Sequence, residues 1–146
     1  MKRALVWHQS RLALPIVGER VVRLIFANEG SPTVHFQREP GQEETELRFY
    51  PAQPVLLAHE TGISSLEPAT LLELRGAKLN EAFAYRKGDL WLAFDNGWTL
   101  AADPIPVDGS CWELTYPRPG YPQSPARDAY FKIEGYDENL LLFDDA

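Results

Sequence analysis

An internal repeat with a separation of 58 residues constrains the fold more than any other feature of the chain. "GERVVRLIFANEGSPTVHF" begins at Gly18 and "GAKLNEAFAYRKGDLWLAF" begins at Gly76, so that 76 − 18 = 58. The same separation relates Gly30 to Gly88. Matched glycines are typical of equivalent chain reversals, because glycine has no Cβ to clash there. The copies are therefore expected to be related units, over residues 18–49 and 76–102.

Each copy is predicted to form a three-stranded antiparallel meander, because its apolar residues alternate with polar ones as in half-buried strands. The third strands are "ETELRFY", after the insert "QREPGQEE", and "WTLAADP", after "DNG". Between the copies, "SSLEPATLLELRG" predicts one helix over residues 66–74. Ser64 and Glu67 have capping-box spacing, and Gly76 stands just past the end.

The C-terminal third has a different composition. Prolines recur through residues 104–125, which predicts a proline-rich loop that holds no central strand except around "CWELTY". The segments "AYFKIEG" and "NLLLFD" then predict a C-terminal hairpin. A length of 146 residues fits one domain with a single core. The expected fold is thus one α+β domain over residues 1–146, predominantly β.

Two tryptophans stand where a hairpin normally has polar residues. If Lys87-Gly88 and Asn96-Gly97 are two-residue turns, Trp91 and Trp98 share one sheet face. Two explanations stay open for this face: an internal layer covers it, or it is an exposed binding patch. The predicted core face holds Phe83, Tyr85, Leu90, Leu92 and Phe94, and the tryptophan face holds Ala82, Ala84, Trp91, Ala93, Trp98 and Leu100.

The chain is acidic, with a net charge of −7 and a pI near 4.9. This charge disfavours a nucleic-acid or anionic-membrane partner and is compatible with a basic protein. Glu43, Glu44 and Glu46, in and beside the acidic insert, are candidate contacts for such a partner. No apolar run approaches the roughly 20 residues of a membrane span. Together with a single cysteine, this favours a soluble, cytoplasmic protein.

Motifs of catalysis and metal binding are absent from the sequence. His8, His35 and His59 are scattered without the spacing of metal ligands. There is neither a glycine-rich phosphate loop nor a nucleophile elbow. Cys111 precedes Trp112 in an expected strand, which favours an inert buried thiol. We therefore assign no catalytic, cofactor-binding or metal-binding residue, and a function without catalysis is favoured.

Residues 71–114, "LLELRGAKLNEAFAYRKGDLWLAFDNGWTLAADPIPVDGSCWEL", resemble an uncharacterised family of small bacterial domains of actinobacterial type. The shared features are a Leu-Gly lead, a hairpin similar to Phe-Asp-Asp-Gly and a closing Trp-Glu-Leu. Here Asn96 replaces the second aspartate, and prolines replace the usual glycine-rich ending. More loosely, the chain is similar to immunity proteins that neutralise toxins. The resemblance implies a β-rich domain and transfers no catalytic residue.

These observations lead to one functional hypothesis and two alternatives. The hypothesis is a non-enzymatic protein-binding module, immunity-like or regulatory, that meets a basic partner through Trp91, Trp98 and the three glutamates. The first alternative is a small enzyme with an unrecognised acidic or cysteine-based site. The second is a structural homo-oligomer, in its simplest form a homodimer, built through the tryptophan face.

Overall fold

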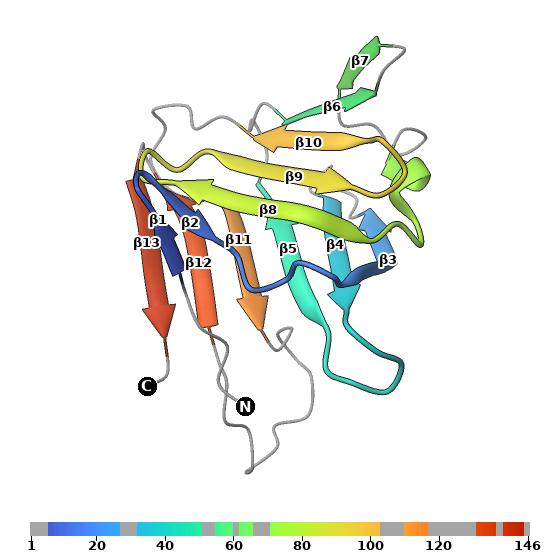
Figure 1. Ribbon diagram of the computed structural model, residues 1–146, viewed down its shortest axis with the longest axis horizontal. Helices are drawn as coiled ribbons and strands as arrows, with labels where there is room; N and C mark the ends of the chain where they lie inside the picture. Colours follow the sequence, from blue (N-terminus) through green and yellow to red (C-terminus); the bar gives the residue numbers. More distant parts are fainter. Residues whose placement is uncertain are drawn as a thin grey trace.

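Two antiparallel sheets make up the computed structural model, which is predominantly β (Figure 1). It describes residues 6–26, 32–50, 55–59, 62–65, 71–102, 110–116, 131–136 and 139–144. Sheet A contains, in spatial order, β1 (Val6–His8), β2 (Arg11–Ala13), β8 (Leu79–Tyr85), β9 (Leu90–Phe94), β10 (Thr99–Ala102), β6 (Val55–His59) and β7 (Gly62–Ser65). Sheet B contains β13 (Asn139–Asp144), β12 (Phe131–Tyr136), β11 (Ser110–Tyr116), β5 (Thr45–Phe49), β4 (Pro32–Gln37) and β3 (Arg20–Phe26).

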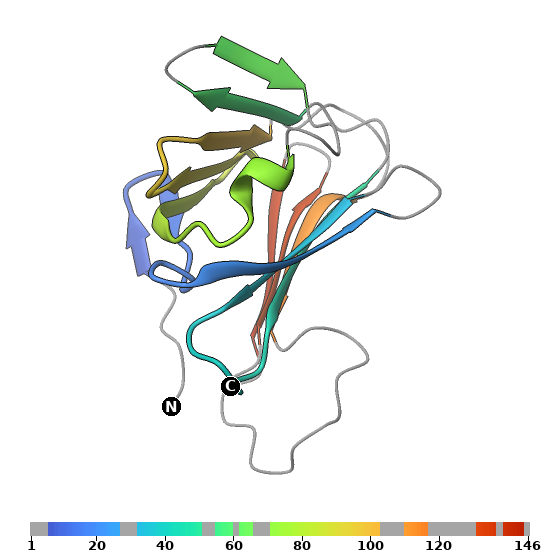
Figure 2. The ribbon, with the colours of Figure 1, turned by 90° about the vertical axis from the view of Figure 1, so that its right-hand side faces the viewer.

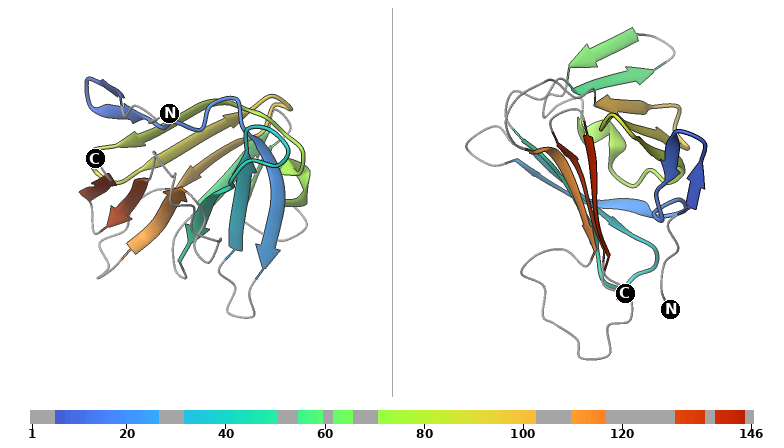
Figure 3. Two further views of the ribbon diagram at one scale, coloured as in Figure 1. Left: turned by 90° about the horizontal axis from the view of Figure 1, so that it is seen from below. Right: turned by 90° about the vertical axis from the view of Figure 1, so that its left-hand side faces the viewer.

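The core lies between the sheets, whose strands run across one another (Figures 1, 2 and 3). Alternation places every second side chain of a strand on the core face. In β9, for example, Leu90, Leu92 and Phe94 are buried, whereas Trp91 and Ala93 between them are only partly buried. Trp112 of β11 is the largest fully buried side chain. The two sheets therefore share one apolar core.

Hydrogen bonds where the sheets meet are related by the separation of 58 residues. Gly18 N donates to Leu79 O at 2.8 Å, and Gly76 N donates to Val21 O at 2.9 Å. Exchanging each residue for its equivalent 58 positions away converts the first bond into the second. The same exchange relates the bond from Val21 N to Ala77 O with that from Leu79 N to Glu19 O, and it exchanges Arg20 and Lys78, which form an antiparallel bridge. The contact between the sheets is therefore locally symmetric.

Strands are exchanged between the two halves of the sandwich. Consecutive strands β3, β4 and β5 pair within sheet B, and β8, β9 and β10 pair within sheet A. The next strand along the chain changes sheet in both cases. β6 pairs with β10 in sheet A, whereas β11 pairs with β5 in sheet B. Equivalence of the two runs as copies stays a prediction, since Gly30 lies outside the described residues.

The intervening helix is not confirmed. Of residues 66–74, the structure describes 71–74, where a 3-10 helix, η1, spans Leu72–Leu74. Gly76 follows it with a positive φ of 80°, at the end that the sequence indicates. The proline-rich loop 104–125 falls mostly outside the described residues, apart from strand β11. β12 and β13 pair antiparallel, which agrees with the expected C-terminal hairpin.

The turns of the two hairpins between 79 and 102 are longer by one residue than the sequence predicts. Tyr85 N bonds to Asp89 O, and Phe94 N bonds to Trp98 O, so each loop has three residues. Each loop ends in a glycine with positive φ, Gly88 at 97° and Gly97 at 90°, as in a type I turn followed by a bulge. Pairing shifts accordingly. The core face holds Ala82 and Ala84, and the opposite face holds Phe83 and Tyr85.

Candidate functional site

Trp91 lies at the centre of an apolar row on the outer face of sheet A. Direct cross-strand pairing connects the row: Ala13 with Phe83, Phe83 with Trp91, Trp91 with Ala101, and Ala101 with Leu56. We call these five residues the aromatic row. Trp91 and Phe83 are half-buried, and Leu56 is 45% exposed. The row therefore forms a continuous apolar strip that crosses five strands.

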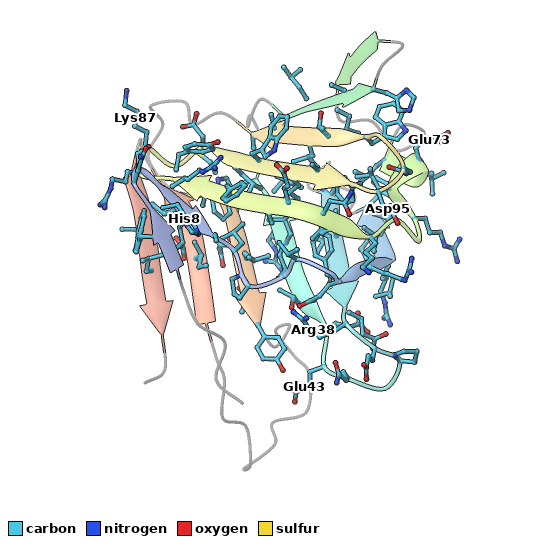
Figure 4. The ribbon with its side chains drawn as sticks, in the orientation of Figure 1. His8, Arg38, Glu43, Glu73, Lys87 and Asp95 are labelled. Carbon is cyan, nitrogen blue, oxygen red and sulfur yellow. The ribbon has the colours of Figure 1, made fainter. Side chains whose placement is uncertain are left out.

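Charged side chains border the aromatic row. The guanidinium of Arg11 lies over the Phe83 ring, 4.0 Å from its centroid, in a cation–π contact. Glu81, two residues before Phe83 on β8, is exposed. Figure 4 places Lys87 and Asp95 at opposite ends of sheet A, and Figure 1, which looks onto the outer face, shows no described element in front of β9 and β10. Trp91 is of intermediate burial, so an exposed patch centred on it stays a prediction.

Trp98 does not share this face with Trp91, so their predicted common face is wrong. Trp98 is partly buried and packs against the core. Its ring lies 5.0 Å from the ring of His59, at an interplanar angle of 41°. The cause is the extra loop residue, because a shift of one position moves a side chain to the other face of the sheet. Only Trp91 of the two belongs to the outer surface.

The three candidate glutamates lie in β5 of sheet B or just before it. They are not the exposed charges that the sequence suggests. Glu44 and Glu46 are buried, and Glu43 is partly buried. His35, itself only 2% exposed, lies between the first two. Its Nε2 is 3.3 Å from Glu46 Oε2, and its Nδ1 is 3.1 Å from Glu44 Oε1.

Arginines at the rim of sheet B form ion pairs with the same two carboxylates. Arg23 Nη2 lies 3.2 Å from Glu44 Oε2, and Arg48 Nη2 lies 3.3 Å from Glu46 Oε1. The Nδ1 contact of His35 has the distance of an ion pair without hydrogen-bond alignment. Buried and paired carboxylates are poor sites for steering a partner. Glu44 and Glu46 therefore contribute to the internal charge network of sheet B.

A second group of charged residues lies on the same face, nearer β12. Lys132 Nζ is 2.9 Å from Glu134 Oε1 and 3.3 Å from Glu113 Oε1, and the hydroxyl of Tyr50 donates to Glu113. The hydrogen bond to Glu134 raises the pKa of Lys132, and the Glu113 charge acts in the same direction, against partial burial. Sequence reasoning missed these residues. Their signal was the charged–apolar alternation of "TELRF", "CWELTY" and "FKIEG".

The chemistry available to the described residues is limited. They contain no group of three or more His, Cys, Asp and Glu side chains that could hold a metal ion. Cys111 is buried, as the sequence predicts. No helix in the described ranges is long and apolar enough to cross a bilayer. The aromatic row is thus the candidate functional site.

Comparison with protein-family models, with curated proteins and with solved structures gives no match. The resemblance of residues 71–114 to small bacterial domains therefore stays a prediction and carries no further argument.

Proposed function

We propose that this protein is a non-enzymatic protein-binding module, immunity-like or regulatory, with the aromatic row as its contact surface. The partly buried Trp91 at the centre of that row carries the proposal. Binding energy in protein interfaces concentrates in a few central aromatic residues surrounded by less important contacts. A strip of phenylalanine, tryptophan and leucine among alanines has this composition, and it lies on a face over which no described element packs.

The chain's charge supports a basic partner. A net charge of −7 attracts a basic protein over a distance of about one Debye length, roughly 8 Å at physiological salt. Near the row, Glu81 and Asp95 are exposed at one end of sheet A. These two carboxylates replace Glu44 and Glu46 as steering groups, because the latter are buried and paired. Apolar contact would then provide affinity, and charge would increase the association rate.

Site-specific photo-crosslinking followed by measurement with the purified partner tests the proposal. A crosslinker at Ala93, beside Trp91 on the outer face, should capture a basic protein, and one at Arg48 on sheet B should not. With that protein purified, Trp91→Ala should weaken binding at least about tenfold, as for a hot-spot residue. Glu81→Lys with Asp95→Lys should slow association and reduce its salt dependence.

Several outcomes would contradict the proposal. They are an equal yield of crosslink at Arg48, an acidic partner, unchanged affinity of the Trp91 variant, and turnover of a small molecule by the purified chain. Lys87→Glu is the control for the charge reversals, since Lys87 is also exposed but lies at the opposite end of sheet A (Figure 4).

A further inference from the structure

Strand β3 forms an open edge of sheet B. Among the described strands it is the last of that sheet and pairs there only with β4. Its first residues are covered, since Arg20 bridges Lys78 and Val21 N donates to Ala77 O. Figure 2 looks onto this edge, and no described strand lies outside residues 22–26. Half of the backbone groups of that segment therefore point away from the sheet.

The open segment is also apolar and exposed. Val22 is 40%, Ile25 is 42% and Phe26 is 40% exposed. Natural edge strands are usually protected by lysine, proline, short length or a bulge. β3 has a bulge between Val21 and Arg23, but residues 22–26 beyond its start contain neither lysine nor proline. Such a strand favours pairing with another extended strand.

We propose that β3 pairs antiparallel with β3 of a second copy and joins two sheets B into one continuous sheet. This surface is distinct from the aromatic row, so the inference goes beyond the proposed function. A two-fold pair of identical strands is self-complementary, as an isologous dimer requires. The register of the strand pair specifies how the second copy binds. Centred on Leu24, the pair places Leu24 opposite Leu24 of the partner subunit and Arg23 opposite Ile25 of the partner subunit.

The alternative register centred on Arg23 is disfavoured, because it places two guanidinium groups opposite each other. In the Leu24 register, Val22 lies opposite Phe26 of the partner subunit, so exposed apolar side chains cover one another. Arg23 is also held toward Glu44, 3.2 Å away, on the outer face of sheet B. No like charges within residues 22–26 then meet across the new strand pair.

The salt dependence of this dimer differs in sign from that of binding to a basic partner. Two copies with a net charge of −7 each repel one another, and salt screens this repulsion. Dimerisation should therefore strengthen with ionic strength, whereas association of a basic protein with the aromatic row should slow. Either proposal can fail without the other.

Sedimentation equilibrium of the full chain tests the dimer. The unaltered chain should dimerise with a dissociation constant below about 1 mM. Ile25→Lys should be monomeric, and at dilutions where both chains are monomers it should have the same melting temperature, because Ile25 is 42% exposed. Leu72→Lys on η1 and Leu142→Lys on the opposite edge strand β13 are matched controls that should dimerise normally. A monomeric unaltered chain, a dimeric Ile25→Lys variant, or dissociation by Leu142→Lys would overturn the proposal.

Disulfide trapping tests the register. In a Cys111→Ala background, Leu24→Cys should give a disulfide-linked dimer on oxidation, because directly opposed residues of paired strands lie within the Cα range of disulfides. Ile25→Cys, opposite Arg23, should crosslink much less. Preferential crosslinking of Ile25→Cys, or no crosslink at either position, would overturn the Leu24-centred pair.

Discussion

Trp112 joins the two sheets through contacts that a single methyl group would disturb. It is fully buried on β11, and its indole Nε1 donates to Gly88 O in the β8–β9 loop at 2.7 Å. Gly135 on β12 is its cross-strand partner. A Cβ on Gly135 would lie 2.3 Å from Trp112 Nε1 and 2.6 Å from Gly88 O. The glycine is therefore required by close approach, since its φ is not in the left-handed region.

Gly135→Ala should consequently lower the free energy of unfolding by about 1–3 kcal/mol, the usual range for overpacking a core. The measurement is denaturant unfolding of the single variants and of the double variant with Trp112→Phe. The smaller ring removes the clash with the indole Nε1 but not the clash with Gly88 O, so the two losses should be less than additive in the double variant. Full additivity would show that the alanine methyl does not meet the indole.

The length of the hairpin loops decides which side chains of the sheet A strands face the core and which face outward. The sequence indicates the hairpins and their glycines correctly, since alternation and Asn-Gly or Lys-Gly pairs are local signals. A two-residue and a three-residue loop both accept glycine at the last position, so the pairing between strands decides which one forms. The choice moves Phe83 to the outer face beside Trp91 and leaves Trp98 against the core.

Because Trp91 is only half-buried, Trp91→Ala should cost about 1–2 kcal/mol of stability, below the roughly 3–5 kcal/mol of a fully buried aromatic residue. Trp112→Ala provides the fully buried comparison. Thermal and denaturant unfolding of the two variants would measure the difference. Equal losses would mean that a further layer covers the outer face of sheet A.

At the scale of the whole molecule, the separation of 58 residues relates not only the two similar sequence segments but also the hydrogen bonds at the junction between the sheets. Gly18 and Gly76 have positive φ values of 92° and 80°, and each amide donates across the junction to the other half. No atom lies closer than 3.9 Å to a Cβ built on either residue, so backbone strain alone opposes a side chain.

Gly18→Ala and Gly76→Ala should therefore destabilise the protein by similar amounts, about 1–3 kcal/mol each. Urea unfolding with a shared slope would compare them. A large loss at one position and none at the other would show that the symmetry of the junction is geometric only and not energetic.

The sequence by itself determined the β-rich character, the positions of most strands, the glycine turns and the burial of Cys111. These depend on local alternation and on backbone freedom, which each segment carries with it. Tertiary structure decided that β6 and β11 exchange sheets, that Glu44 and Glu46 lie buried around His35, and that Trp91 but not Trp98 lies on the outer face. These outcomes depend on which segments distant in sequence pack together. The free energy of that packing cannot be read from a local sequence pattern.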